Sequence, residues 1–244
     1  SATPSAAPEP TPVPAPALDF SLPAPETGAV EDDWFSDAVF LGDSRSDGLR
    51  LYSGIRGADF LAYKSLMVFQ VTGTGGVDAK AIPKNGVGDK KTALAWLEEK
   101  QYGKVYVMFG INELGYGDDQ AFQDAFALLI DEIRVRQPEA VIYIQSLIPV
   151  EPEKAHQMNP AVWLNNENVA NYNEILRRVC ADKRAVYVDV QSVMADDSGT
   201  LPAEGTTDGI HFTRSWYEKW YGYLKTHTVD PEAYRAGQGQ AEGT

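Results

Sequence analysis

Short apolar runs alternate with longer amphipathic segments along most of the chain. Four runs are continuous and rich in β-branched and aromatic residues, as buried strands are: 38–43, 104–110, 140–149 and 185–190. The run at 58–71 is a fifth, less regular strand candidate. Apolar positions at helical spacing predict helices over 89–100, 119–137, 166–183 and 213–226. This alternation predicts βαβ units, and therefore a parallel sheet with helices on both faces.

The two ends of the chain depart from this pattern. Residues 1–27 hold eight of the fifteen prolines, which favours an extended, semi-rigid spacer. We therefore expect a Pro-rich acidic linker over 1–35, one domain over 36–229 and a disordered tail over 230–244. Such a spacer suits a secreted domain that is tethered to a membrane or cell wall, so the expected location is extracellular or in the cell envelope.

Composition excludes several classes of protein. The net charge is −14, but eight acids and no Lys or Arg lie in the first 44 residues, so much of the acidity belongs to that end. The sequence contains no cluster of Lys and Arg, which argues against a nucleic-acid partner. No apolar run approaches the roughly 20 residues of a membrane helix. The single cysteine, Cys180, falls on an apolar helical stripe and is expected to be a buried structural thiol.

Polar residues follow the predicted strands, at the edge where sheets of this kind bind ligands. Ser44 follows the first strand in "GDS", and Asp208 and His211 stand three residues apart in "DGIH" after the last one. A serine nucleophile needs a general base, and that base needs a third group to fix its tautomer. Alone, Ser44 would be an ordinary helix N-cap. Asn112, just after the 104–110 strand, could stabilise the oxyanion of acyl transfer.

These residues stand in motifs that resemble the SGNH hydrolases, also called GDSL esterases and lipases. "FLGDS", "GINE" and "DGIHF" are similar to the first, third and last sequence blocks of that family, and the likeness covers about residues 36–228. The resemblance implies a Ser44–His211–Asp208 triad and an oxyanion hole with the Ser44 N–H and Asn112. It also implies a flavodoxin-like α/β/α sandwich with about five parallel strands in the order 2-1-3-4-5, and no metal or organic cofactor. "GINELGYG" resembles bacterial, envelope-associated members.

Two positions depart from the family pattern. The second block contributes a backbone N–H from a glycine, and its equivalent here is either Ser65 in "AYKSLMVF" or Gly73 in "TGTGG". A serine can serve because the donor is the main chain, although its Cβ narrows the oxyanion hole. Glu113 replaces the usual aspartate after Asn112, a change expected to affect loop structure more than chemistry.

Other candidate motifs are weaker. "TGTGG" lacks the Gly-Lys-Ser/Thr ending of a phosphate-binding loop. His156 with Glu151 and Glu153 lacks the paired ligand spacing of a metal site and indicates a solvated loop. Tyr116 and Trp163 lie in predicted loops at the same edge, where an exposed aromatic ring could stack on a sugar.

The resulting hypothesis is a serine esterase that removes small acyl groups, acetyl above all, from extracellular or envelope carbohydrate. The expected partner is a small-molecule or glycan ester, and the sequence indicates no oligomeric state. Three alternatives stay open: a lipase or thioesterase, a sugar O-acyltransferase with the same triad, and a non-catalytic glycan-binding module.

Overall fold

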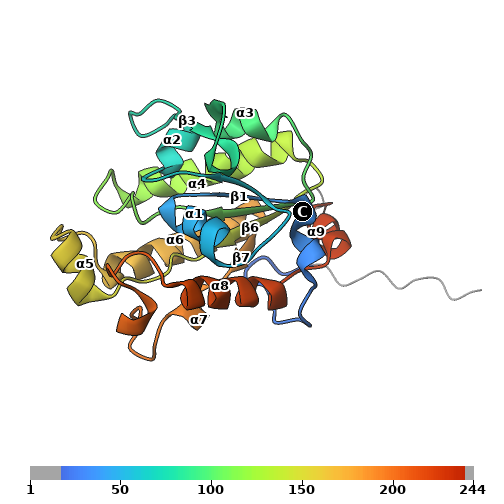
Figure 1. Cartoon of the computed structure of the whole chain (residues 1–244). Coiled ribbons are helices and arrows are strands. Elements are labelled where there is room, and N and C mark those ends of the chain that lie inside the picture. The colour runs from blue at the N-terminus through green and yellow to red at the C-terminus, as the bar shows by residue number, and fades with distance from the viewer. Residues whose placement is uncertain (1–17, 240–244) are drawn as a thin grey trace, which may run out of the picture.

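A single parallel sheet forms the centre of the computed structural model, which describes residues 18–239 (Figure 1). Its strands, in spatial order, are β2 (Asp59–Ala62), β1 (Ala38–Gly42), β5 (Lys104–Met108), β6 (Val141–Gln145) and β7 (Val186–Val188), all parallel. Counting the strands of this sheet alone, the order is 2-1-3-4-5. The predicted fold class and strand order are therefore confirmed.

Helices cover both faces of the sheet (Figure 1). On one face, the two long helices α4 (Asp119–Arg136) and α6 (Asn166–Lys183) pack together, and α4 also contacts α2 (Val68–Thr72) and α3 (Ala93–Leu97). On the other face, α1 (Ser44–Tyr52) packs against α8 (Arg214–Thr226), which also contacts α7 (Gln191–Met194). Of the helices between residues 18 and 239, none combines the length and apolar character that crossing a membrane requires.

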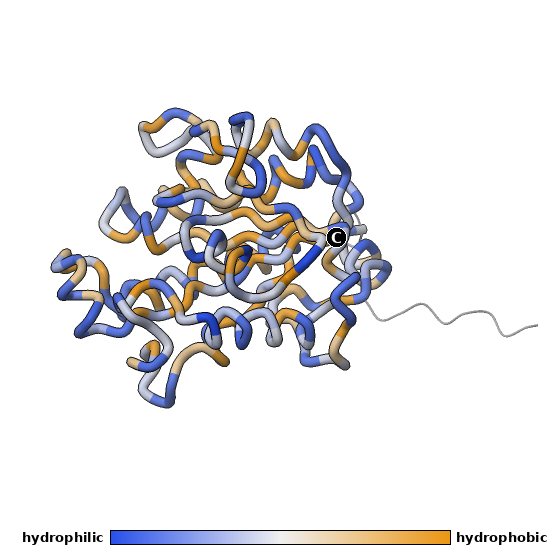
Figure 2. Tube along the Cα trace, in the orientation of Figure 1, coloured by the Kyte–Doolittle hydropathy of each residue, from blue (hydrophilic) through white to orange (hydrophobic). Residues whose placement is uncertain are grey.

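Aromatic side chains fix the register of the central strands. Phe60, Phe40, Tyr106 and Tyr143 are direct neighbours on four adjacent strands, with successive ring centroids 4.8, 4.7 and 4.4 Å apart. Every residue of β1, β5 and β6 is buried, so their sequences read as continuous apolar runs rather than alternating ones. Figure 2 shows these apolar positions inside the molecule.

Several short elements differ from the sequence-based expectations. The strand candidate 58–71 divides into β2 and helix α2, and the helix expected over 89–100 is only α3, preceded by an antiparallel hairpin of β3 (Ala81–Pro83) and β4 (Lys90–Thr92). Thr92 ends the hairpin and caps α3 by accepting a hydrogen bond from the Ala95 N–H. The expected loop around His156 is helix α5 (Pro152–Met158), which begins with a proline and is capped by Glu151. The structure also contains the 3-10 helices η1 (Asp32–Asp37), η2 (Lys84–Gly86) and η3 (Ala203–Gly205).

The two chain ends extend the packed domain beyond the expected boundaries. Residues 18–35, assigned to a linker from sequence, lie on the domain: Phe20, Ala24 and Phe35 are buried, and the Ala24 N–H donates to the Tyr187 carbonyl on edge strand β7. The expected disordered tail contains helix α9 (Pro231–Gly239), whose buried Tyr234 packs edge-on against Phe20. The rest of the predicted linker, 1–17, and of the tail, 240–244, lie outside the described residues.

Candidate active site

Ser44 lies where β1 ends and α1 begins, and it does not cap that helix. The N-cap is Asp43, whose carboxylate accepts a hydrogen bond from the Arg45 N–H at 2.8 Å. The Ser44 hydroxyl instead lies 2.8 Å from Nε2 of His211. The preceding strand ends in Gly42 because a Cβ there would lie 2.0 Å from the Ser46 hydroxyl. The sharp turn from strand to helix therefore leaves the Ser44 side chain available for chemistry.

Asp208 holds the other side of the His211 ring. Its Oδ2 lies 2.7 Å from Nδ1, while its Oδ1 accepts hydrogen bonds from the main-chain N–H groups of Ile210 and His211. Partial burial opposes ionisation, but the hydrogen bonds from His211 and Ile210 outweigh it and lower the pKa of Asp208. An ionised Asp208 keeps the ring proton on Nδ1, so Nε2 is free to accept the proton of the Ser44 hydroxyl.

Two more of the predicted residues meet Ser44 around a cavity of about 400 Å³. Asn112 follows β5, and its side-chain amide donates to Asp43 and to the Leu66 carbonyl at 3.2 and 3.3 Å. Ser65 lies in the turn after β2 with φ of +57°, a left-handed conformation that glycine adopts more easily. Both line the cavity together with Ser44 and His211.

Gly73, the competing choice for the second block, lies elsewhere. It is the left-handed C-cap of α2, with φ of 68°, and it does not line this cavity. The structure therefore places Ser65, and not Gly73, beside Ser44 and Asn112.

Tyr116 and Trp163, predicted to contact substrate, are not among the residues that line the cavity, and their contact with a sugar stays a prediction. The Tyr116 hydroxyl donates to the Gly75 carbonyl, and its ring packs on Phe69. The Trp163 ring covers Gly115 so closely that a Cβ there would lie 2.3 Å from it. Both aromatic residues therefore have structural contacts, although Trp163 stays 47% exposed and directly precedes the cavity residue Leu164.

Two buried charged residues, Asp43 and Arg45, pack beneath the surface of the site on either side of Ser44. Neither residue is assigned a role from the sequence. Asp43 is fully buried, and burial raises its pKa, although the Arg45 guanidinium opposes this. Arg45 is also fully buried; it donates to the carbonyls of Ile148 and Ile210 and stacks over the Phe212 ring. Arg45 thereby ties the start of α1 to the segment that carries His211. The signal available in the sequence was a pair of ionisable residues flanking Ser44.

Glu113 gives a testable dependence of stability on pH. Burial raises its pKa from the ordinary 4.5 to about 8, so the folded protein keeps a proton that the unfolded chain has released. This contribution to stability is complete below pH 4.5 and is lost as the pH rises to about 8. As the pH rises over this range, the melting temperature of wild type should fall. The fall in Glu113→Gln should be several degrees smaller, since 1 kcal/mol shifts the melting temperature by about 2–4 °C. If scanning calorimetry shows the same change in melting temperature between pH 5 and pH 8.5 for wild type and Glu113→Gln, this assignment is contradicted.

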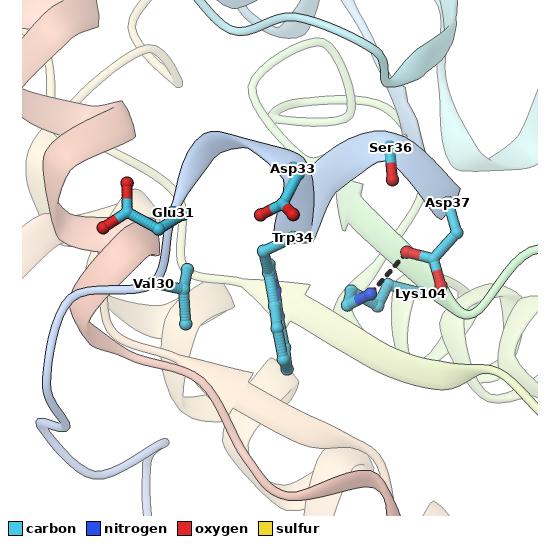
Figure 3. A pocket seen from close by; sticks show the side chains of 7 residues that line it. All are labelled: Val30, Glu31, Asp33, Trp34, Ser36, Asp37 and Lys104. Atoms are coloured by element: carbon cyan, nitrogen blue, oxygen red, sulfur yellow. Dashed lines mark hydrogen bonds and ion pairs between the residues drawn. The ribbon is translucent and has the colours of Figure 1, made fainter.

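A second hollow lies at the opposite end of the sheet, by the first residues of β1 and β5 (Figure 3). Trp34 stands between Val30 and Lys104, with the Lys104 ammonium 4.3 Å from the ring centroid and paired with Asp37. The hollow is lined by Val30, Glu31, Asp33, Trp34, Ser36, Asp37 and Lys104. This lining contains acids and one buried lysine, but it does not place a nucleophile next to a base. Ligands of open parallel sheets bind at the carboxyl ends of the strands, where Ser44 lies.

The remaining His and Cys side chains in the described part of the chain lie apart from one another. Between residues 18 and 239, no three His, Cys, Asp or Glu side chains come together as a metal site would require. His156 lies on α5 and lines a different hollow, with Pro152 and Val162. Cys180 is fully buried in α6, and burial raises the pKa of its thiol.

An α/β sandwich with a hydrogen-bonded Ser–His–Asp chain at its strand ends has the arrangement of a serine hydrolase. Residues 40–219 match the GDSL-like Lipase/Acylhydrolase family. The chain belongs to this family of carboxylic ester hydrolases.

Solved structures of low sequence identity share the fold. A Streptococcus pneumonia structure that carries the name platelet activating factor has 22% identity and a TM-score of 0.58, over 78% of this chain and 82% of that one. A peptidoglycan O-acetylesterase has 15% identity and a TM-score of 0.50, over 68% and 43%. A carbohydrate esterase family 3 protein from Talaromyces cellulolyticus has 13% identity and a TM-score of 0.50, over 77% and 94%. None of the curated proteins matches the chain.

Proposed function

We propose that this esterase removes small acyl groups, acetyl above all, from carbohydrate, with Ser44, His211 and Asp208 as its catalytic triad. The observation that carries the proposal is the continuous hydrogen-bond chain from Ser44 through His211 to Asp208 at the wall of a cavity. Among the described residues, no other hydroxyl at the cavity lies within hydrogen-bond reach of a base.

The chemistry follows from this geometry. Ser44 Oγ attacks the ester carbonyl while Nε2 of His211 takes its proton, and the carbonyl becomes a tetrahedral oxyanion. His211 then gives that proton to the departing alcohol, which leaves an acyl ester on Ser44. A water molecule, deprotonated by His211, attacks this ester, and the carboxylic acid departs as Ser44 regains its proton. Asp208 keeps the proton on Nδ1 and stabilises the imidazolium that forms in each half-reaction.

The side-chain amide of Asn112 and the main-chain N–H groups of Ser44 and Ser65 are the proposed donors to the oxyanion. All three residues line the cavity. Because the two N–H groups of Asn112 contact Asp43 and the Leu66 carbonyl at 3.2 and 3.3 Å, one of these long contacts is exchanged for the oxyanion when substrate binds. The Ser44 N–H belongs to the first turn of α1, where no helical acceptor exists. Within the described residues, the Ser65 N–H likewise has no acceptor in the protein.

Replacing Asn112 with alanine tests the oxyanion hole. We expect kcat for an acetyl ester to fall about 10²- to 10³-fold, the usual effect of losing one such donor, with a smaller change in KM. Steady-state kinetics measure this, with Asn171→Ala on the exposed face of α6 as the matched control. A variant with Asn112→Ala that kept its full kcat would remove Asn112 from the reaction.

Size and polarity of the cavity favour a short acyl group on a polar alcohol. About 400 Å³ of space is shared between apolar residues, Ile111, Leu164 and Ile210, and polar ones that include Asp47 and Lys64. A short acyl chain fits the apolar part, and sugar hydroxyls can bond to the polar part. Two of the fold relatives bear names for acetyl or carbohydrate ester hydrolysis, which is consistent with this substrate class.

The proposed location is outside the cell or in its envelope, with the Pro-rich N-terminal residues as a spacer to a membrane or wall anchor. Composition supports this location, since six prolines lie in residues 1–17, ahead of the segment that packs on the domain. The resemblance of "GINELGYG" to envelope-associated members of the family supports the same location.

Hydrolysis of p-nitrophenyl esters from acetate to dodecanoate tests the acyl preference, together with acetate release from acetylated xylan and acetylated peptidoglycan. We expect kcat/KM to be highest for acetate and to fall by at least about tenfold in the longer esters. One feature favours the alternative of a lipid ester: Met158, Val162 and Trp163 are exposed apolar residues between the cavity residues Asn159 and Leu164, or next to them. Rates that rise with chain length, without acetate release from either glycan, would select this alternative.

A further inference from the structure

Glu113 is a fully buried carboxyl group that the proposed reaction does not use. It directly follows Asn112, and burial raises its pKa to about 8, so it is mainly uncharged at neutral pH. A buried acid is costly to keep, and Oε2 of Glu113 has no hydrogen-bond partner. The contact made by its other oxygen must therefore account for its presence.

That other oxygen, Oε1, accepts a hydrogen bond from the main-chain N–H of Val68. Val68 is the first residue of α2, and the N-cap Met67 has no side-chain oxygen to satisfy this donor. Glu113 therefore caps α2 from a different loop of the protein, the one that follows β5.

The turn with Ser65 lies immediately before α2, and four hydrogen bonds hold it. The Tyr63 N–H donates to the Gly42 carbonyl at the end of β1, and the Leu66 N–H donates back to the Tyr63 carbonyl. Asn112 donates to the Leu66 carbonyl, and Glu113 accepts from the Val68 N–H. Asn112 and Glu113, adjacent in one loop, thus bond the residues before and after Met67, which lies two residues beyond Ser65.

Ser65 needs such support because its backbone is strained. A φ of +57° costs a non-glycine residue on the order of 1 kcal/mol or more, so an unrestrained Ser65 would relax toward negative φ and turn its N–H away. A displacement of about 1 Å at a catalytic donor can cost about 100-fold in rate.

We propose that Glu113 is a positioning residue that, through the Val68 N–H, holds the Ser65 main chain opposite Asn112, so that donors from two separate loops converge on one oxyanion. The inference rests on the proposed ester hydrolysis. The function of Glu113 depends on its hydrogen-bond acceptor and not on its charge, because an amide oxygen can accept the same bond.

Variants on both sides of this hydrogen bond test the proposal in the full chain, with p-nitrophenyl acetate as substrate. Glu113→Ala removes the acceptor, and we expect kcat to fall about 10- to 100-fold with little change in KM. Glu113→Gln keeps the acceptor and is expected to stay within about threefold of wild type. Val68→Pro removes the donor, and the change suits its place: proline is favoured at the first helical position, and Met67 has the extended backbone that a following proline requires.

A double variant, Glu113→Ala with Val68→Pro, shows whether the two residues act as one unit. If they do, the double variant is no slower than the slower single variant. Gln137→Ala is the matched control, because Gln137 is a fully buried side chain that bonds main-chain groups at the far end of the sheet. It should lower the melting temperature and leave kcat unchanged.

Hydrogen exchange of residues 60–72 gives a readout that does not need activity. We expect faster exchange at the Leu66 N–H in Glu113→Ala and Val68→Pro, and wild-type exchange in Glu113→Gln. A wild-type kcat in Glu113→Ala, or losses that multiply in the double variant, would overturn the positioning function and leave the esterase in place. A wild type without turnover on any ester would instead refute the proposed function, while exchange would still decide the position of Ser65.

Discussion

Ser44→Ala is expected to lower kcat for p-nitrophenyl acetate by about 10⁴- to 10⁶-fold, the range known for loss of a serine nucleophile. The reason is specific to this site: between residues 18 and 239 the Ser44 hydroxyl has His211 as its sole hydrogen-bond partner, and Asp43 supplies the helix cap. Removal of the hydroxyl should therefore leave the fold and the melting temperature nearly unchanged. The loss would be chemical rather than structural.

Ser36→Ala is the matched control for that measurement. Ser36 is exposed at the hollow of Figure 3, at the other end of the sheet, and its change should leave kcat at the wild-type level. A covalent label makes the test sharper, because a fluorophosphonate should modify wild type and Ser36→Ala once per chain and leave Ser44→Ala unmodified. Equal turnover by wild type and Ser44→Ala would refute the triad and favour a binding module.

Asp208→Asn is expected to lower kcat by about 10⁴-fold through the wrong histidine tautomer. The N–H groups of Ile210 and His211 both point at Oδ1, so an asparagine must place its oxygen there. Its NH2 group then faces Nδ1 of His211, which has to become the acceptor. The ring proton moves to Nε2, and His211 can no longer accept the proton of Ser44.

Asp196→Asn provides a comparison for Asp208→Asn. Asp196 also accepts hydrogen bonds from nearby main-chain N–H groups, those of Ser198 and Thr200, but it lies in an exposed turn without a histidine. We expect it to keep full activity, and NMR of the histidine ring nitrogens to show the tautomer change in Asp208→Asn alone. An active Asp208→Asn with its proton still on Nδ1 would exclude Asp208 from the reaction.

The central sheet could be predicted because each of its long strands is buried on both faces. Runs such as 104–110 and 140–149 are mostly apolar and do not alternate with polar residues, which is typical of strands buried on both faces. The segment 58–71 was less clear, because a short apolar run fits a strand or a buried helix equally well. Its helix α2 begins at Val68, whose N–H donates to Glu113, 45 residues further along the chain, and no local pattern reveals that contact. The hairpin of β3 and β4 has three residues in each strand, too few for a periodic signal.

The candidate site divides in the same way. Ser44, Asn112, Asp208 and His211 stand in short local motifs, and the structure brings all four together. The environments of Asp43, Arg45 and Glu113 depend on main-chain partners such as Ile148 and Val68, which no local pattern reveals. Tyr116 and Trp163 were chosen for residue type and predicted loop position, which do not determine where a ring points.

In Figure 1, both ends of the described chain lie on the side of the domain opposite α5, the helix that directly precedes the cavity residue Asn159. The N-terminal segment enters β1 through η1, and its Val30 N–H donates to the Lys225 carbonyl at the last turn of α8, whereas His211 precedes the first turn. A fusion partner, bead or surface joined through the N-terminal segment would therefore attach on the side of the domain away from the cavity and leave the cavity entrance accessible. Immobilised protein should keep its turnover on soluble esters and also reach acyl groups on an insoluble polymer in front of it.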